Sequence, residues 1–256
     1  YTEADFTNVK ASIGWGESTL NRGILPNRGY SQSVTLQTTV PAASDLEFYK
    51  LDYRGQHFTP LSKQTALRLH TELGYGDGFG DTDGLPFYEN YFAGGISSVR
   101  GFRNGSLGPR AVASLAFPNI SSNPNQLPNY DPVTGIYQCN PATGICTDPD
   151  QDDQPFGGNV MITGGVDYLF PLPFIKDQSS LRTTFFVDVG NVFSTNCDDF
   201  QVDCNSPDLG DLAVSTGFGL TWITAMGPLG FAIATPIKEP DNSDPQFFQF
   251  TLGQTF

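Results

Sequence analysis

Hydrophobic and polar residues alternate one by one along nine segments of the chain. In one of them, Leu67 and Leu69 alternate with Arg68 and His70, so the two kinds of side chain fall on opposite faces of an extended chain. This two-residue period is typical of β-strands. The segments predicted as strands are 8–19, 30–40, 47–58, 65–75, 160–170, 180–193, 212–224, 230–238 and 246–256.

The connections between these segments are of two kinds. Short or Pro/Gly-rich connections alternate along much of the chain with long, acidic ones that contain cysteine. Because successive connections of an up-and-down sheet lie at opposite ends, one rim is expected to be tight and the other elaborate, as in outer-membrane barrels. The tight connections lie near 20–29, 61–64, 172–179 and 225–229, and the long ones are 81–159 and 194–211.

The polar faces of the predicted strands differ from the wet face of a water-soluble sheet. Several carry Gly, Ala, Ser or Thr with isolated charges such as Asp167, Arg182 and Asp188, and the apolar faces end in Tyr, Trp or Phe. A soluble sandwich buries its apolar face, whereas a membrane barrel turns that face toward lipid and places aromatic residues at the interfaces. We therefore predict an all-β, antiparallel transmembrane β-barrel of about 8–9 strands, with a soluble sandwich as the alternative.

Charge and composition exclude two other classes of protein. The chain has 13 Lys and Arg against 27 Asp and Glu, a net charge of −14, whereas nucleic-acid binding requires a basic face. No apolar run approaches the roughly 18 residues of a membrane helix, which excludes a helical membrane protein but not a barrel. The first residue is Tyr rather than Met, so we expect the chain to be a piece of a longer protein.

Four cysteines form two pairs of equal spacing, Cys139 with Cys146 and Cys197 with Cys204, each in an acidic loop. Neither pair has the spacing of a zinc site, and histidine is scarce. We favour two local disulfides over free thiols, which implies an oxidising compartment.

The segment 86–108 shows neither strand alternation nor a helical period. It contains five glycines and the sequence Val99-Arg100-Gly101-Phe102, and it lies in a connection, 81–159, so long that it should be either functional or disordered. Five aromatic residues fall within 16 positions of its front part, a composition that argues against disorder. We predict a packed, functional loop there.

The loop and the strands also contain a specific set of short sequences: GYGDGFG (74–80), PFYENYFAGG (86–95), SVRGF (98–102), GP (108–109), DYLFPLPF (167–174), FFVDVGNVF (185–193), GPLGFAIATP (227–236) and FQFTLGQTF (248–256). In these the chain resembles the C-terminal part of the barrel in the BamA family, the outer-membrane protein assembly factors of Gram-negative bacteria. The VRGF sequence alone would mark only the wider superfamily, which includes secretion pores. The resemblance implies that residues 1–256 are the C-terminal portion of a larger barrel domain that follows periplasmic POTRA domains.

Because the resemblance implies that the chain is only part of a larger barrel, there is more than one way in which its strands could close. We expect a small closed barrel of eight or nine strands. An odd number of alternating strands can close only through a parallel pair. The alternatives are an eight-stranded barrel with the first segment outside the sheet, and an open sheet that pairs with another copy as a homodimer.

The resemblance also implies two sites. The first is a loop that folds into the lumen, formed by Val99, Arg100, Gly101 and Phe102, whose arginine pairs with the inward carboxylates Asp167 and Asp188. The second is the last strand, which resembles the targeting signal of outer-membrane barrels. Its residues are Phe248, Phe250, Leu252, Gly253 and Phe256.

The sequence predicts neither a catalytic site nor a metal site. The two histidines, His57 and His70, have no serine placed beside them by a recognisable motif, so no catalytic residue is predicted. The acidic runs near residues 76–84 and 148–153 are interpreted as solvated loops, because the second lacks the glycine and closing glutamate of an EF-hand. No metal and no cofactor are expected.

The resemblance therefore implies a non-enzymatic protein of the bacterial outer membrane that helps fold and insert other β-barrel proteins. Its partners would be the lipid bilayer, nascent outer-membrane proteins and, through periplasmic domains absent from this chain, the lipoproteins of the assembly complex. By itself the chain is expected to be inactive. The alternatives are a secretion pore of the same superfamily and a passive porin-like channel.

Overall fold

The computed structural model describes residues 7–111, 154–172, 175, 180–197, 201–202, 204, 206–241 and 243–253. All nine segments predicted as strands form strands, and most boundaries agree within about two residues. Their bounds are β1 Lys10–Ser18, β2 Gly29–Thr39, β3 Phe48–Pro60, β4 Ala66–Gly78, β7 Val160–Phe170, β8 Leu181–Phe193, β10 Ala213–Thr224, β11 Gly227–Lys238 and β12 Phe248–Leu252.

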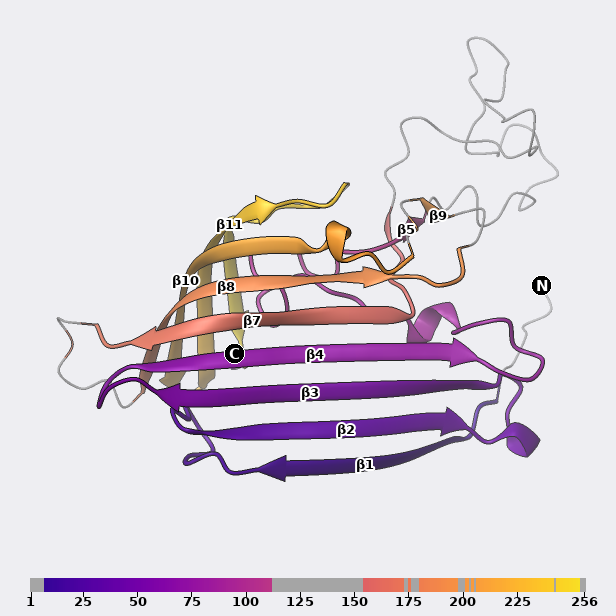
Figure 1. Ribbon diagram of the computed structural model, residues 1–256, viewed down its shortest axis with the longest axis horizontal. Coiled ribbons are helices and arrows are strands. Elements are labelled where there is room, and N and C mark those ends of the chain that lie inside the picture. The colour runs from indigo at the N-terminus through magenta and orange to yellow at the C-terminus, as the bar shows by residue number, and fades with distance from the viewer. Residues whose placement is uncertain are drawn as a thin grey trace, which may run out of the picture.

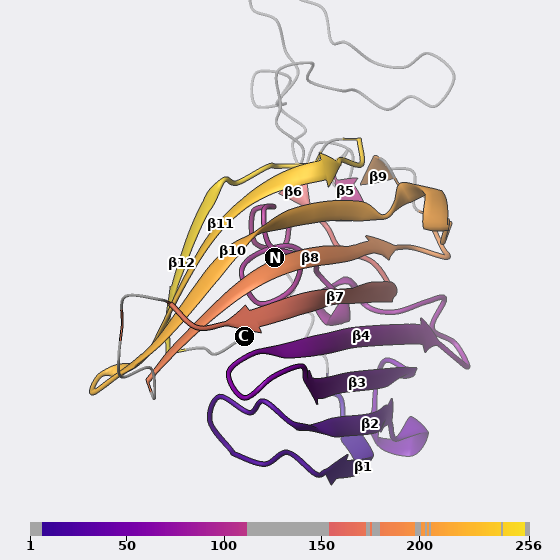
Figure 2. The same ribbon diagram turned by 60° about the vertical axis from the view of Figure 1, so that its left-hand side comes forward.

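These strands form one antiparallel sheet in the order β1-β2-β3-β4-β7-β8-β10-β11-β12, so neighbours in the sheet are also neighbours in the chain. The sheet is strongly curved, with β1 and β12 at its two ends (Figures 1 and 2). The fold class and the strand count are confirmed, but the expected closure is not found. Among the described residues, β1 pairs only with β2 and β12 only with β11. Nine alternating strands make β1 and β12 run in the same direction, so they cannot close the sheet with another antiparallel pair.

Shorter elements join the long-loop end of the sheet, and the sequence did not predict them. A second sheet has the order β6-β5-β9 and brings together three distant dipeptides. They are β5 Arg110–Ala111, β6 Gln154–Pro155 and β9 Gln201–Val202. Each is too short to show an alternation in the sequence. Three 3₁₀ helices are present as well: η1 Pro41–Ala43 lies between β2 and β3, and η2 Phe87–Glu89 and η4 Leu209–Asp211 lie in the long connections.

The two faces of the main sheet differ as the sequence predicted. On the convex face, Ile13 is 73% exposed and Phe218 is 58% exposed. On the concave face, by contrast, Asp167 and Asp188 are at most 1% exposed. A water-soluble sheet would bury its large apolar side chains and expose its charges, so this distribution is that of a barrel wall facing lipid.

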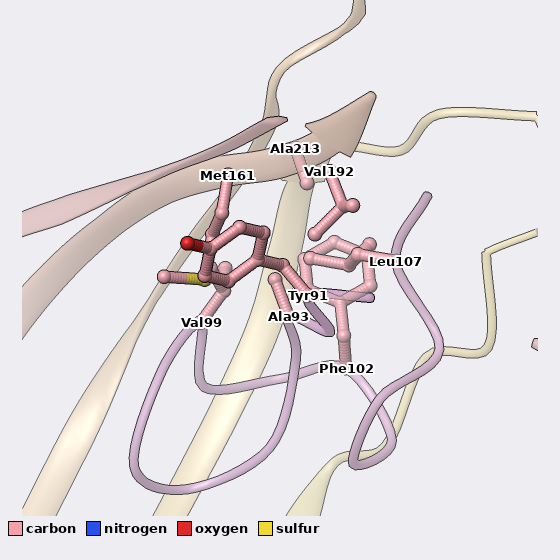
Figure 3. Close-up of a cluster of buried hydrophobic side chains, with 8 residues drawn as sticks. All are labelled: Tyr91, Ala93, Val99, Phe102, Leu107, Met161, Val192 and Ala213. Atoms are coloured by element: carbon pink, nitrogen blue, oxygen red, sulfur yellow. The ribbon is translucent and has the colours of Figure 1, made fainter. Parts of the chain in front are cut away.

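The segment after β4 folds back onto the concave face and forms a hydrophobic core there with residues of β7, β8 and β10 (Figure 3). Phe102 and Val99 are completely buried in this core. Each fully buried side chain of this size stabilises the packed state by roughly 1.5–3 kcal/mol. The members of the cluster are Tyr91, Ala93, Val99, Phe102, Leu107, Met161, Val192 and Ala213.

In the part of the chain that the structure describes, no helix has the length and apolar character required to cross a membrane.

Candidate functional site

The loop that carries Val99 to Phe102 owes its path to glycines. Gly94, Gly95 and Gly101 have φ values of +104°, +91° and +93°, a region that other residues rarely adopt. At Gly101 space is also short, because a Cβ atom would lie 3.1 Å from the Cβ of Ala234 and 3.2 Å from that of Ser215. Glycine therefore allows the backbone to approach the sheet closely enough for the neighbouring Arg100 to reach it.

Arg100 contacts both carboxylates that the sequence placed on the inward face. Its Nε donates to Asp188 Oδ2 at 2.7 Å, and its Nη2 donates to Asp188 Oδ1 at 2.8 Å and to Asp167 Oδ1 at 2.6 Å. The backbone N–H of Arg100 also donates to Asp188, at 3.1 Å. The guanidinium lies over the ring of Phe186, with 3.6 Å between Cζ and the ring centroid. The structure thus brings the proposed residues together, while their role as a lock on the loop stays a prediction.

The charges of this buried cluster are balanced. Arg68 is the second cation, and its Nη1 lies 3.0 Å from Asp167 Oδ2, so two guanidinium groups face two carboxylates. Burial alone would lower the pKa of Arg100, but Asp188 and then Asp167 outweigh it and raise that pKa above its usual value. Arg100 is therefore charged at neutral pH.

His70 is the fifth member of the cluster, but its Nε2 forms no hydrogen bond with the other members. Its Nε2 lies 3.7 Å from Asp188 and 3.8 Å from Asp167. His70 and these two carboxylates are close enough together to resemble a metal site. The carboxylates already bind Arg100 and Arg68, however, so little uncompensated negative charge is left for a divalent cation.

The backbone around Arg100 is bound to the last strands of the sheet. Ser215 Oγ of β10 donates to the carbonyl of Arg100. On β12, Gln249 accepts from the N–H of Gly101 at 3.1 Å and donates to the carbonyl of Phe102 at 2.6 Å. Neither Ser215 nor Gln249 is predicted from the sequence as part of this site. A signal was available for Gln249, since it is a polar residue between two phenylalanines of a strand and must face inward.

The front of the loop is bound to the opposite end of the sheet. Glu89 of η2 forms ion pairs with Lys10 of β1 and with Lys50 of β3. Lys50 Nζ also donates to the carbonyl of Glu89 at 2.6 Å and lies 4.4 Å from the centroid of the Tyr91 ring. The loop therefore connects β1 and β12, the two edge strands, across the concave face.

The last strand presents its predicted aromatic face to the outside. Phe248, Phe250 and Leu252 are each more than half exposed on the convex face of β12, and Gly253 follows with φ +88°. Phe256 lies outside the described residues. The backbone edge of β12 away from β11 has no strand partner among the described residues. The strand therefore combines an apolar face with a free edge, and its role as a signal stays a prediction.

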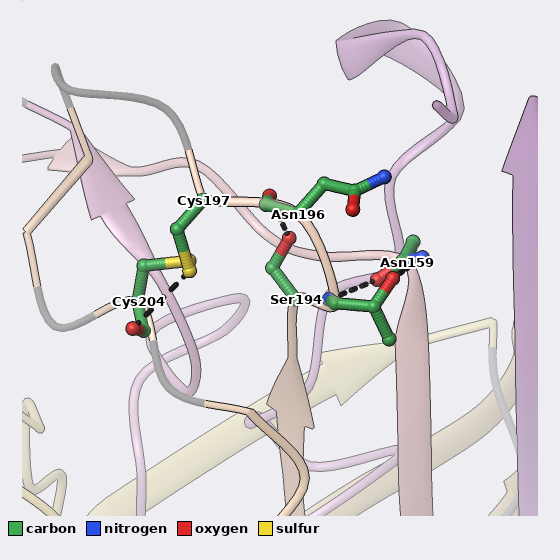
Figure 4. Close-up of a disulfide and its surroundings, with 6 residues drawn as sticks. Asn159, Ser194, Asn196, Cys197 and Cys204 are labelled. Atoms are coloured by element: carbon green, nitrogen blue, oxygen red, sulfur yellow. Dashed lines mark hydrogen bonds between the residues drawn. A yellow bond between two sulfur atoms is a disulfide. The ribbon is translucent and has the colours of Figure 1, made fainter. Parts of the chain in front are cut away.

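One of the two predicted disulfides is present. Cys197 and Cys204 are bonded at the long-loop end of β8, on either side of β9 (Figure 4). Next to it, buried Asn159 accepts from the Thr195 N–H at 2.9 Å and donates to the carbonyl of Gly76 at 2.9 Å. Cys139 and Cys146 lie outside the described residues.

Comparisons with known proteins agree with this arrangement of barrel wall and inward loop. The sequence matches the Omp85 superfamily domain over residues 2–256, and the chain belongs to this superfamily of the bacterial outer membrane. It is 29% identical, over 263 aligned positions, to the outer membrane protein assembly factor BamA of Neisseria meningitidis serogroup B. The crystal structure of BamA from Haemophilus ducreyi lacking POTRA domains 1–3 is similar, with a TM-score of 0.72 and 30% sequence identity.

The two matches cover almost all of this chain but only part of each relative. Each includes 96% of the present chain. The chain spans 28% of the length of the Neisseria protein and 42% of the Haemophilus chain. These matches therefore show the fold and the family of the chain. They do not show the activity of the whole relatives for this chain.

Proposed function

We propose that this chain is barrel wall from an outer-membrane protein assembly factor, which folds other β-barrel proteins and inserts them into the outer membrane. The observation that carries the proposal is the inward loop held by Arg100, Asp167 and Asp188, in a chain similar to two BamA proteins over 96% of its length. Both relatives are BamA proteins, and the Neisseria protein is named an outer membrane protein assembly factor. We therefore favour assembly over those alternatives.

The mechanism we propose uses strand edges and needs no catalytic group or cofactor. An exposed edge offers a row of unpaired N–H and C=O groups that can pair with a strand of an incoming chain. The β12 edge is such a template, and its apolar face would lie in the bilayer beside the client. The loop keeps the wall curved while the edge is free, because it is bound to β1 through Glu89 and to β12 through Gln249.

The partners would be the lipid bilayer, nascent outer-membrane proteins and the lipoproteins of the assembly complex. A homodimer through the open edges is a further arrangement, but the geometry disfavours it. Because β1 and β12 run in the same direction, two copies inserted with the same orientation would meet only through parallel strand pairs. Parallel pairing is slightly less stable per residue than antiparallel pairing.

The function is tested by replacing the matching portion of Neisseria BamA with this chain and reconstituting the chimera in liposomes. The readout is folding of a urea-denatured outer-membrane barrel protein, followed by its heat-sensitive electrophoretic mobility. We expect the chimera to fold the client faster than empty liposomes do, and the 256-residue chain alone to give no acceleration. A chimera that is itself folded but inactive would contradict the proposal.

A matched pair of variants tests the role of the loop in that assay. Arg100→Ala should reduce the folding rate by about tenfold or more, because about 1.4 kcal/mol of lost stabilisation already corresponds to a factor of ten. Arg103→Ala removes an exposed arginine of the same loop and should leave the rate unchanged. Equal rates for the two variants would show that the Arg100 contacts play no part in the activity.

A further inference from the structure

Arg182 is an inward-facing arginine of β8 that the loop site does not use. It lies near the rim where tight turns join β1 to β2, β3 to β4, β7 to β8 and β10 to β11, the tight-turn rim. Its Nη2 donates to the carbonyl of Pro26, and its Cζ lies 5.7 Å from the centroid of the Phe58 ring. Both are neutral partners, and no carboxylate of the described residues lies within ion-pair distance of Arg182. A half-buried guanidinium that pairs with no carboxylate of the described residues is costly.

A cavity of about 240 Å³ lies beside Arg182 at the tight-turn rim. Arg22, from the turn between β1 and β2, lines it together with Arg182, and no carboxylate is among its described lining residues. Hydroxyl and amide groups of Thr65, Asn27 and Gln64 add hydrogen-bonding capacity. Asp167, on the same face of the neighbouring strand β7, is already bound to Arg68 and Arg100. The described lining of the cavity therefore carries two positive charges and no negative one, although the chain has a net charge of −14.

The other walls of the cavity are apolar and include residues from the lipid side of the sheet. Leu181 is opposite Trp222 in the pairing of β8 with β10 and shares its convex face. Phe170 stacks on Tyr168, which is also on that face. In a bilayer, the phosphate groups of the phospholipids lie next to their acyl chains. A cavity with two arginines beside a lipid-facing apolar wall matches this boundary.

We propose that Arg22 and Arg182 form a binding site for the phosphate group of an anionic phospholipid at the tight-turn rim. Arginine binds phosphate through two parallel N–H···O bonds, and the cavity is large enough for a phosphate group and the start of the chains it carries. A lipid bound there would also hold the turn between β1 and β2 against β8. The site is independent of the proposed assembly activity, since it lies outside the Arg100 cluster.

The experiment uses the full chain in bilayers of equal phosphatidylglycerol and phosphatidylcholine. After mild detergent extraction, native mass spectrometry counts the lipids that stay bound. We expect the wild type to retain phosphatidylglycerol, and Arg182→Gln and Arg22→Gln to retain about tenfold less, the loss of one charge-assisted bidentate contact. Arg28→Gln is the matched control, because Arg28 is exposed on the same turn but does not line the cavity, and it should retain the lipid.

Three outcomes would overturn the proposal. One is equal lipid retention by Arg22→Gln and Arg28→Gln, which would indicate diffuse attraction by the rim. Another is equal retention of the two lipids by the wild type. A third is stabilisation of the protein by inorganic phosphate without retention of phosphatidylglycerol, which would assign the site to free phosphate. Because Arg22 is exposed on a turn, its variant keeps the test valid even where Arg182→Gln does not fold.

Discussion

Arg100 owes its position to four residues of three kinds: a glycine that lets the backbone approach, two aspartates that bind the guanidinium, and a phenylalanine on which it lies. Both aspartates are buried, so Asp188 depends on Arg100 for its charge balance, and Asp167 depends on Arg100 and Arg68 together. The cluster is consequently sensitive to the loss of a single member, in contrast to an exposed ion pair such as Arg54 with Glu72.

The first prediction concerns the arginine itself. Arg100→Ala leaves two buried carboxylates with one guanidinium, and breaking a buried pair in this way costs about 3–5 kcal/mol. The loop at 90–110 should then become sensitive to protease and exchange its amide hydrogens faster. Arg103→Ala, at an exposed position of the same loop, is the control. Unchanged protection of 90–110 in Arg100→Ala would show that the guanidinium does not hold the loop.

A second prediction separates backbone strain from crowding. At Gly101 an alanine meets both a positive φ and two Cβ atoms at 3.1 and 3.2 Å, whereas at Gly105, φ +69°, it meets nothing closer than 3.7 Å. Gly105→Ala should cost about 1–3 kcal/mol from strain alone, and Gly101→Ala should cost more. Thermal unfolding of both variants in one detergent measures the difference. Equal losses would mean that the loop moves freely away from the sheet at Gly101.

At the scale of elements, the strands could be predicted because each alternates over many residues, and alternation identifies both a strand and its two faces. The pairing of Arg100 with Asp167 and Asp188 followed from the resemblance together with the parity of β7 and β8. The path of the loop could not be predicted, because it depends on positive-φ glycines and on distant contacts such as that of Glu89 with Lys10. Dipeptide strands such as β5 have no pattern of their own and form only where the folded chain brings them together.

The contact between the loop and β12 gives a third prediction. Gln249→Leu removes two hydrogen bonds to the loop backbone and leaves buried polar groups unsatisfied, at a cost of about 1–3 kcal/mol each. Hydrogen exchange should increase both at 101–102 and along β12. Thr251→Val changes a polar residue on the same face of β12 and is the control. Faster exchange in β12 alone would indicate that the loop is held by Arg100 without help from the last strand.

At the scale of the whole molecule, a nine-stranded sheet keeps its curvature without closing. We propose that the inward loop braces the open sheet, with its core against β7, β8 and β10 and its polar contacts at β1 and β12. Both edges run the same way, so parity excludes antiparallel closure of the expected small barrel, and no parallel pair of β1 with β12 is found among the described residues. The same brace leaves two edges and an apolar convex face, the surface that a membrane-embedded template requires.

All of these conclusions depend on which face of the sheet meets lipid, and the two tryptophans of the chain report on that face directly. Trp15 and Trp222 both lie on the convex side and are 56% and 46% exposed. In bilayers made with lipids brominated on their acyl chains, their fluorescence should be strongly quenched, while a water-soluble quencher such as iodide should have little effect. Strong quenching by iodide with none by the brominated lipids, from a protein that stays monodisperse in plain buffer, would contradict the account.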